Sequence, residues 1–515
     1  MCGIIGIIGS TNKDEIASLI EPISNRGNND ANCTNIDNNI LGNILLEIID
    51  KKNGTQPIYN KSRTKLIVFN GEIYNYKKLR IELISKGYSF YTNTDTEVIL
   101  ALYDEYKENL LDYLDGMFSF VIYDKINKQC FGARDHFGIK PLFYTLINSK
   151  LYFSSEMKSF IHLTDCTDIQ ELRPGQYFIF SQNTIRLSRY YNLNDINDSL
   201  LTFGDAKDKI YKYMHKSVHK RVQTNLPICI FFSGGIDSTI ILYLAKLYHV
   251  NVKAFIIGLD NSEDVKISKK YCIENNVDYE IVSFTKKELL SSIPKIIYHI
   301  ESFEPNVVRG ATLSYLLSKK AHESGYKIAL CGEGSDEIFS GYGDFLKLDN
   351  ESLCCDLSYK LTMDLHRTQL LRVDRTSMAF QLEVRVPFLD KKVVELALSL
   401  PQKYKIGLLN NKKTTKFILR EAFKEVLPSY IYSRQKMTLM HGSGADKVNR
   451  EVGLFYDNAT DIISDITFLE IKNNYQDFNI EDKETAYYFN IFKKHYPHVS
   501  CSTRRTINAT TEIDE

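Results

Sequence analysis

Hydrophobic and polar residues follow two different patterns along the chain, and the pattern changes near residue 200. Before the change, short apolar segments separated by turn residues predict a sheet-rich domain. Two segments in this part space their apolar residues as an α-helix does, near Lys77–Lys86 and Thr94–Tyr106. We expect two packed sheets covered by helices. The predicted strands read GIIGII, KLIVFN, MFSFVIYD, QCFGARD, KLYFSSE and QYFIFS.

After the change, apolar strands alternate with helical segments. Such alternation predicts a parallel sheet with helices on both faces. An amphipathic helix opens this part of the chain, and its inward positions are Ile210, Met214, Ser217, Val218 and Arg221. The strand and helix pairs read ICIFF with TIILYLAKLY, KAFIIGL with DVKISKKYCIE, and KIALC with DEIFSGYGDF.

The polar stretch NLNDINDSLL separates the two patterns, so we place the domain boundary between about 192 and 205. We expect a first domain over residues 1–192 and a second over 203–498. The segment 499–515 has little that could enter a core and is expected to be a mobile tail. A chain of 515 residues is too long for a single core, in agreement with at least two domains.

The chain carries 64 lysines and arginines against 64 aspartates and glutamates. This balance argues against nucleic acid or an anionic membrane as the main partner. Its ten cysteines show neither zinc-site nor CxxC spacing, which is typical of reduced thiols in the cytoplasm. No apolar run approaches the roughly 18 residues of a membrane span, and no basic flank of a signal peptide is present. We therefore expect a cytoplasmic protein that binds small molecules.

A cysteine follows the first methionine, in the segment MCGIIGIIGS. One interpretation is a small apolar residue buried in a strand. The other is catalysis. Once Met1 is removed, which the small size of Cys2 permits, the residue holds a thiol nucleophile beside its own α-amino group as general base. These ten residues alone favour burial.

The segment ICIFFSGGIDSTIILYLAK combines a strand, a loop and a helix that we expect to begin at or near Ser238. Gly234 and Gly235 allow the backbone to close around an anion at the helix N-terminus. Asp237 would repel phosphate unless Mg2+ lay between them. A second strand-end loop, CGEGSDE, brings carboxylates including Asp336 to the same edge of the sheet. The two loops predict a magnesium–nucleotide site rather than a structural turn.

With these two features the chain resembles the glutamine-hydrolysing asparagine synthetase family over most of its length, and SGGIDS resembles the pyrophosphate loop of N-type ATP pyrophosphatases. The resemblance implies an α+β N-terminal nucleophile sandwich (αββα) that acts as a class II glutamine amidotransferase. An α/β domain with a parallel sheet of the ATP pyrophosphatase type then follows, and the family suggests a homodimer. The motifs in the family's order are FNGEIYNY, TDTEVILALY, ARDHFGIKPLFY, SSEMKSF, CGEGSDE, LEVRVPFLDKK and RQK.

In the first domain, the resemblance implies that Cys2 attacks the side-chain amide of glutamine. Asn70 and Gly71 match the oxyanion hole, a task worth about 2.7–4 kcal/mol per donor. Glu72 and Asp95 match groups that hold the glutamine α-ammonium. The implied catalytic and glutamine-binding residues together are Cys2, Arg26, Ile49, Asn70, Gly71, Glu72 and Asp95.

In the second domain, the resemblance implies that ATP activates a carboxylate as an acyl-adenylate, which ammonia then attacks. Asp237 and Asp336 match Mg2+ ligands, and Lys436 matches a lysine that neutralises the leaving pyrophosphate. Glu333 matches a residue needed for the chemical steps, and Arg309 offers a partner for a substrate carboxylate or a phosphate. The implied ATP-binding residues are Phe232, Ser233, Gly234, Gly235, Asp237, Ser238, Ile257, Cys331, Gly332 and Lys436.

The glutamine site departs from the family pattern. Leu45 stands where the family has an arginine for the glutamine α-carboxylate, and NRGNN replaces HRGPD but keeps Arg26. Losing one partner of a buried charge pair costs about 2–5 kcal/mol, or roughly 30-fold to several thousand-fold in binding. The site then binds glutamine poorly, uses a relocated cation such as Arg26, or serves a free-ammonia route.

The acceptor side departs as well. Around Arg309 the chain reads EPNVVR in place of an aspartate and two threonines, and after RQK it reads MTLMHG, where Met437 and His441 replace carboxylates. The main prediction is asparagine synthesis from aspartate, ATP and either glutamine or ammonia. The alternatives are amidation of another carboxylate, such as a sugar acid or a peptide precursor, and a nucleotide-binding protein without catalysis. The intact phosphate loops and carboxylates argue against the last.

Overall fold

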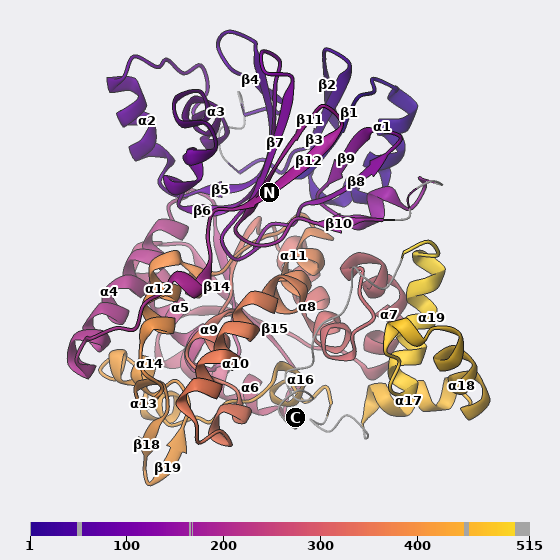
Figure 1. Cartoon of the computed structure of the whole chain (residues 1–515). Helices are drawn as coiled ribbons and strands as arrows, with labels where there is room; N and C mark the ends of the chain where they lie inside the picture. Colours follow the sequence, from indigo (N-terminus) through magenta and orange to yellow (C-terminus); the bar gives the residue numbers. More distant parts are fainter. Residues whose placement is uncertain (1, 49–53, 164–165, 167, 447–452, 500–515) are drawn as a thin grey trace. The chain divides into compact units, whose positions relative to one another are not determined.

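The computed structural model describes the chain except for residues 1, 49–53, 164–165, 167, 447–452 and 500–515. Its described residues divide into two compact units (Figure 1). Unit 1 is built mainly from the residues up to Asn192, and unit 2 mainly from Leu193 onward. Two later segments group with unit 1, namely Met378–Gln381 and the described residues that begin at Lys493. Of the predicted tail, every residue but Val499 lies outside the described residues.

Unit 1 contains two six-stranded antiparallel sheets. One has the order β10-β8-β9-β1-β3-β2 and the other the order β12-β11-β7-β6-β5-β4. The strands are β1 (Gly3–Ile8), β2 (Asn32–Ile36), β3 (Asn39–Ile44), β4 (Ile58–Tyr59), β5 (Lys65–Ile73), β6 (Gly116–Asp124), β7 (Gln129–Arg134), β8 (Phe143–Ile147), β9 (Lys150–Ser154), β10 (Gln170–Glu171), β11 (Gln176–Ser181) and β12 (Thr184–Arg189).

The period-two alternation of β6 shows how the layers form. Val121 and Tyr123 point to one face and pack with residues of the other sheet. Phe120 and Ile122 point to the opposite face and pack under two helices. The result is a sandwich with helical cover, as the sequence predicts. The helices of unit 1 are α1 (Lys13–Ile20), α2 (Tyr76–Ser85) and α3 (Asp95–Tyr106).

Unit 2 is centred on a five-stranded parallel sheet of order β15-β14-β13-β16-β17. Its strands are β13 (Ile228–Phe231), β14 (Val252–Ile257), β15 (Asp278–Val282), β16 (Ile328–Leu330) and β17 (Glu383–Arg385), and a separate hairpin consists of β18 (Gly407–Leu409) and β19 (Lys412–Thr414). The helices are α4 (Phe203–Arg221), α5 (Ile236–Tyr248), α6 (Glu263–Glu274), α7 (Lys286–Ile300), α8 (Pro305–Glu323), α9 (Ser335–Ile338), α10 (Glu351–Asp364), α11 (Gln369–Met378), α12 (Lys391–Ser399), α13 (Gln402–Lys405), α14 (Phe417–Ala422), α15 (Ser429–Tyr432), α16 (Leu439–Gly442), α17 (Leu454–Ile462), α18 (Asp465–Asn474) and α19 (Lys483–His495).

The helix after the glycine loop begins at Ile236, near Ser238 as expected. A second helical segment is shorter than expected. The segment DEIFSGYGDF is helical only as far as Ile338 and in a short 3-10 turn from Gly343. Between them, Ser340 adopts a left-handed φ of 54° and the Gly341 N–H donates to the Asp336 carbonyl at 2.7 Å, so the chain turns instead of continuing the helix.

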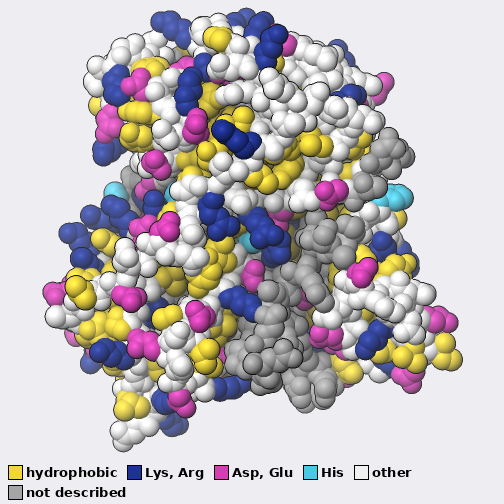
Figure 2. Space-filling view, in the orientation of Figure 1, with side chains coloured by type: hydrophobic (Ala, Val, Ile, Leu, Met, Phe, Trp, Pro, Cys, Tyr) yellow, Lys and Arg dark blue, Asp and Glu magenta, His cyan; other side chains and the backbone are white. Residues whose placement is uncertain are grey.

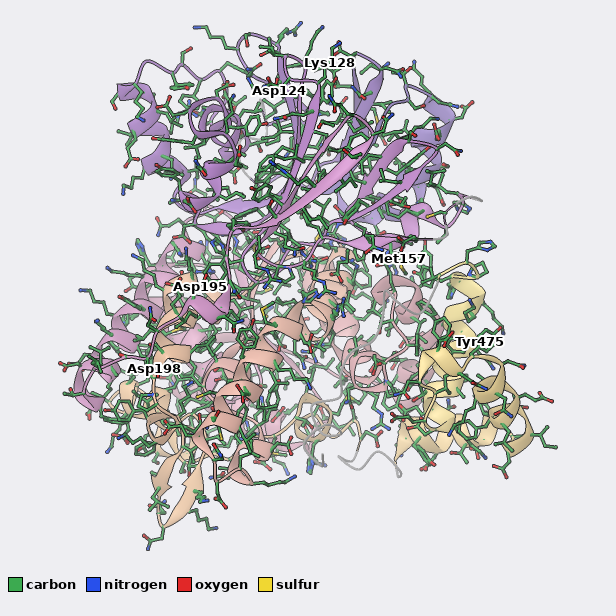
Figure 3. The ribbon with its side chains drawn as sticks, in the orientation of Figure 1. Asp124, Lys128, Met157, Asp195, Asp198 and Tyr475 are labelled. Atoms are coloured by element: carbon green, nitrogen blue, oxygen red, sulfur yellow. The ribbon has the colours of Figure 1, made fainter. Side chains whose placement is uncertain are left out.

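Charged side chains of both signs are interspersed over the face drawn in Figure 2, which accords with the equal numbers of acidic and basic residues. Figure 3 shows Asp124 and Lys128 at the turn between β6 and β7. There the Asp124 carboxylate accepts the backbone N–H groups of Ile126 and Asn127 at 3.0 and 3.2 Å and holds the turn. Within the described residues, no helix is long and apolar enough to cross a membrane.

Candidate active sites

Cys2 immediately precedes β1, and its side chain is buried. The Cys2 backbone N–H donates to Asn70 Oδ1 at 3.1 Å, so strand β5 positions the group that would become the α-amine. Burial raises the pKa of the Cys2 thiol, and the negative charge of Asp95 adds to that effect. A thiol with a raised pKa needs a nearby base to become a nucleophile, and the α-amine of a cleaved chain supplies one.

The predicted oxyanion hole is formed by consecutive residues of β5. Asn70 is fully buried, and its amide Nδ2 has no hydrogen-bond partner among the described residues. A buried donor without a partner is costly unless a ligand satisfies it. At Gly71, φ is 153° and a Cβ would lie 2.1 Å from the Met117 carbonyl oxygen, so a side chain does not fit there. The Asn70 amide suits the stabilisation of an oxyanion, whereas the need for glycine at position 71 comes from close packing against β6.

The predicted ammonium-binding acids lie next to this strand. Glu72 follows Gly71 in β5 and is buried. Asp95 begins α3, behind the N-cap Thr94, and accepts the Ile73 N–H at 3.0 Å. The structure thus brings both carboxylates to the end of β5 that carries Asn70.

Arg26 has a structural environment that the sequence did not predict. Its Nε donates to the Cys2 carbonyl at 3.2 Å, and its Nη1 forms an ion pair with Glu156 at 2.5 Å. Lys158 binds the other oxygen of the same carboxylate, and all three side chains are at most 1% exposed. Arg26 therefore holds the backbone of the nucleophile, and it shares the carboxylate of Glu156 with Lys158.

Leu45, at the position of the family's arginine, is half-buried, and its carbonyl accepts the Asn28 N–H at 3.0 Å. The NRGNN loop thus packs directly against it. Ile49, the remaining predicted glutamine-binding residue, lies outside the described residues.

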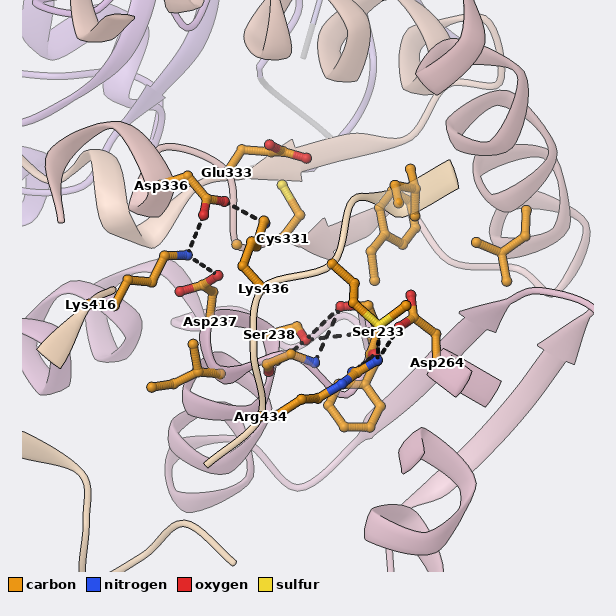
Figure 4. Close-up of a pocket in the computed structure, with 18 of the residues that line it drawn as sticks. Ser233, Asp237, Ser238, Asp264, Cys331, Glu333, Asp336, Lys416, Arg434 and Lys436 are labelled. Atoms are coloured by element: carbon orange, nitrogen blue, oxygen red, sulfur yellow. Dashed lines mark hydrogen bonds and ion pairs between the residues drawn. The ribbon is translucent and has the colours of Figure 1, made fainter. Parts of the chain in front are cut away.

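The second candidate site is a pocket in unit 2 at the carboxyl ends of β13 and β16 (Figure 4). Ligands of open α/β sheets bind at this edge. Among the described residues, Gly234 and Arg309 are the only predicted residues of this domain that do not line it. Those that do are Phe232, Ser233, Gly235, Asp237, Ser238, Ile257, Cys331, Gly332, Glu333, Asp336 and Lys436.

The glycine loop is preorganised by local hydrogen bonds. Gly234 has a left-handed φ of 64°, and Gly235 is the N-cap of α5 and provides no side-chain cap for the helix N–H groups. The Ser238 and Thr239 hydroxyls donate back to the Gly235 carbonyl at 3.2 and 2.7 Å. The first-turn N–H groups of α5 remain available for an anion. Arg434 fixes the loop from outside by donating to the Ser233 carbonyl at 3.0 Å.

Two lysines neutralise the two predicted metal ligands. Lys416 Nζ lies 2.5 Å from Asp237 Oδ2 and 2.7 Å from Asp336 Oδ1, and Lys436 Nζ lies 2.6 Å from Asp336 Oδ2. Burial raises the pKa of the Asp336 carboxyl, but the two ammonium groups outweigh it and hold the pKa below its usual range. Burial lowers the pKa of Lys436, yet Asp336 and Asp237 outweigh that effect and raise it. Asp336 and Lys436 are therefore both charged at neutral pH.

The donor set suits Mg2+. The ammonium group of Lys416 contacts one carboxylate oxygen of Asp237 and one of Asp336. The two carboxylates are therefore close enough together for a single metal ion to bind both. Among the described residues, no cluster of three or more candidate metal-ligating side chains occurs. Mg2+ is commonly held by one or two carboxylates together with substrate phosphates, which is the set this pocket offers.

Glu333 and Arg309 are each paired with a partner that the sequence did not indicate. Arg372 of α11 binds the carboxylate of Glu333, which lines the pocket. Arg309 of α8 forms a two-pronged ion pair with Glu484 of α19, with Nε at 2.7 Å from Oε1. The Tyr488 hydroxyl donates to the same Oε1 at 2.9 Å. The predicted role of Arg309 toward a substrate carboxylate or phosphate stays a prediction.

Comparison with known proteins assigns the chain to a class. Residues 1–197 match the model of a glutamine amidotransferase domain, and residues 209–357 and 350–461 match the model of asparagine synthase. The chain therefore joins an amidotransferase half to an asparagine synthase half, and it is an asparagine synthase-like ligase.

Curated relatives give the family. A glutamine-hydrolysing asparagine synthetase 2 of Oryza sativa subsp. japonica is 31% identical over 98% of this chain and 90% of its own length. The corresponding enzyme 2 of Arabidopsis thaliana is 31% identical over 98% and 92%, and one of Sandersonia aurantiaca is 31% identical over 98% and 98%. The chain belongs to the family of glutamine-hydrolysing asparagine synthetases.

Proposed function

We propose that the chain makes asparagine from aspartate in an ATP-dependent reaction, with ammonia taken from glutamine or from solution. The aspartate side-chain carboxylate attacks the α-phosphorus of ATP and gives an acyl-adenylate and pyrophosphate. Ammonia then attacks the acyl carbon, loses a proton and displaces AMP. The observation that carries the proposal is the pocket at the sheet edge, where a helix N-terminus, two carboxylates and Lys436 converge.

Each group in the pocket has a role that its position supports. The α5 N-terminus and Lys436 would bind the phosphates and stabilise the leaving pyrophosphate. Glu333, at the pocket wall, would accept the proton of the attacking ammonia. Asp237 and Asp336 would hold Mg2+, which when bound supplies charge neutralisation of the triphosphate.

In unit 1 the residues support glutamine hydrolysis. The Cys2 thiolate would attack the amide carbon, and the α-amine would take the thiol proton and pass it to the departing ammonia. Asn70 Nδ2 and the Gly71 N–H would stabilise the oxyanion. Water would then cleave the thioester and release glutamate.

A product assay tests the proposed chemistry. Purified protein is incubated with ATP, Mg2+, aspartate and ammonium, and nucleotide, phosphate and amino-acid products are quantified. We expect AMP, pyrophosphate and asparagine in equal amounts, with no turnover after chelation of Mg2+. Formation of ADP and phosphate would contradict the proposed role of the glycine loop.

A second acceptor is favoured by one observation. Met437, which replaces a carboxylate of the family pattern, lines the pocket, and its sulfur contacts Arg434 Nη2 at 3.6 Å. We therefore expect the pocket to tolerate or prefer a carboxylate other than free aspartate. Pyrophosphate release across a panel of amino acids, sugar acids and short peptides measures this. An advantage of tenfold or more in kcat/KM for aspartate over every other acceptor removes the alternative.

The glutamine site is expected to be weak because of Leu45. An apolar side chain gives the glutamine α-carboxylate no charge-assisted partner, and Arg26 is already bound to Glu156 and to the Cys2 carbonyl. Leu45→Arg should lower the KM for glutamine at least tenfold and leave the KM for ammonia unchanged. Leu45→Met, which stays apolar, should leave both constants near those of the parent. If the parent has a KM for glutamine below about 1 mM, the upper end of the usual range, another cation binds the carboxylate and the argument fails.

A further inference from the structure

The space between Asp237 and Asp336 contains an ammonium group. Lys416 Nζ contacts one oxygen of each carboxylate, at 2.5 and 2.7 Å, as the dashed lines in Figure 4 show. Only about 1% of the Lys416 side chain is exposed, so water does not screen these contacts. Asp237 also accepts the Ser335 hydroxyl through its other oxygen, at 2.6 Å. Both carboxylates are thereby oriented toward one point.

The backbone around Lys416 is built to place this ammonium group. Lys416 adopts a left-handed φ of 55° at the junction between β19 and α14, which directs its side chain inward. Arg420 holds the junction by donating its N–H to the Lys416 carbonyl and its Nε to the Thr415 carbonyl, both at 2.9 Å. A Cβ at Gly341 would lie 2.3 Å from Lys416 Cε, so glycine is needed there to give the side chain room.

Lys436 does not serve the same purpose. Its Nζ contacts Asp336 only, and about a third of its side chain is exposed. Lys416 alone among the described lysines bridges the two carboxylates. Without it, the two carboxylates would face each other with Lys436 bound to Asp336 and only the guanidinium of Arg420 acting on Asp237 electrostatically, and like charges at such range repel strongly.

We propose that Lys416 is the resident cation of this site: it preassembles Asp237 and Asp336 in the nucleotide-free protein and excludes a divalent ion until nucleotide arrives. The proposal rests on the proposed function because it takes these two carboxylates as the metal ligands. Nucleotide phosphates supply additional oxygen ligands to the metal and an alternative anionic partner to the ammonium. Metal binding is therefore coupled to nucleotide binding.

A binding titration with Mn2+, used in place of Mg2+, tests the proposal without nucleotide or turnover. The electron paramagnetic resonance signal of free Mn2+ measures how much of the ion is bound. The parent protein should bind Mn2+ weakly. Lys416→Met should bind it at least tenfold more tightly, and Lys416→Arg, which keeps a cation, should resemble the parent. The matched control is Lys413→Met, at an exposed lysine of β19 three residues before Lys416, which should also resemble the parent. Asp237→Asn combined with Lys416→Met should lose the gain because one carboxylate is missing.

Thermal unfolding in metal-free buffer provides a second readout. Lys416→Met should melt at a lower temperature than the parent. Mn2+ should raise the melting temperature of the variant to that of the parent, and it should leave the melting temperature of the parent unchanged. The proposal is overturned if folded Lys416→Met binds Mn2+ no more tightly than the parent does. It is also overturned if Lys416→Met stays unfolded in the presence of saturating Mn2+. A failure of the proposed function would appear separately, as absent pyrophosphate release by the parent.

Discussion

Asp237→Asn is expected to abolish amide synthesis with free ammonia as well as with glutamine. The substitution keeps the size of the side chain but removes a negative charge that lies 2.5 Å from Lys416 and faces Asp336 across it. Loss of one preorganised electrostatic contact to reacting groups costs about 10²–10³-fold in kcat, and loss of a metal ligand adds to it. We expect a decrease of at least about 10³-fold in pyrophosphate release, measured with each nitrogen donor.

The control for this variant is Asp260→Asn, at an exposed aspartate that follows β14 in the same unit. It should retain the activity of the parent. Glutamine hydrolysis by Asp237→Asn, assayed as glutamate release, should persist because the Cys2 site belongs to the other compact unit. Substantial ammonia-dependent synthesis by a folded Asp237→Asn protein would show that this carboxylate does not act on the phosphates.

Cys2→Ala should eliminate the use of glutamine and leave the use of ammonia intact. The backbone N–H of Cys2 donates to Asn70 Oδ1, so the thiol belongs to the residue that is held against the proposed oxyanion hole. Because the pocket of unit 2 is built from residues 231–439, none of its groups is altered by the change. The measurement is asparagine formation with saturating glutamine and, separately, with ammonium.

Cys33→Ala serves as the matched control, since this cysteine lies in β2 of the same unit and is only partly buried. It should retain both activities. If Cys2→Ala still consumed glutamine, the nucleophile would be another residue. If it also lost ammonia-dependent synthesis while folded, the two reactions would not be separable in the way proposed.

The hydrophobic pattern predicted most of the fold because the spacing of apolar residues follows the buried faces of helices and strands. In α4, the residues expected to face inward, from Ile210 to Arg221, are buried in the structure. The strands missed in unit 1 include β2 and β12, which both lie at a sheet edge and have only one buried residue between them. Such strands carry little apolar pattern. The turn at Ser340 was missed because a left-handed serine has no sequence signal comparable to glycine.

The sequence predicted the parts of the site that consist of consecutive residues in one loop. It did not predict the ion pairs between residues that are far apart in the sequence. The glycine loop and CGEGSDE can be read from consecutive residues. Lys416 is one of several lysines in NNKKTTK, and nothing in that segment distinguishes it from Lys413. Arg372 and Glu484 are likewise ordinary charged residues on helices. Their partners, 39 and 175 positions away, are known only once the chain is folded.

The ion pair between Arg309 and Glu484 has a bearing on how the protein can be shortened or recombined. Glu484 belongs to α19, near the end of the described chain, whereas Arg309 lies in α8 beside the parallel sheet. A fragment that ended before α19 would retain every strand of that sheet and the whole phosphate loop. It would also retain the buried guanidinium of Arg309 but would lack the carboxylate of Glu484 that pairs with it. Removing one partner of a buried pair costs about 3–5 kcal/mol, a large part of a typical domain's stability. Expression fragments and chimaeras of unit 2 therefore need α8 and α19 from the same parent.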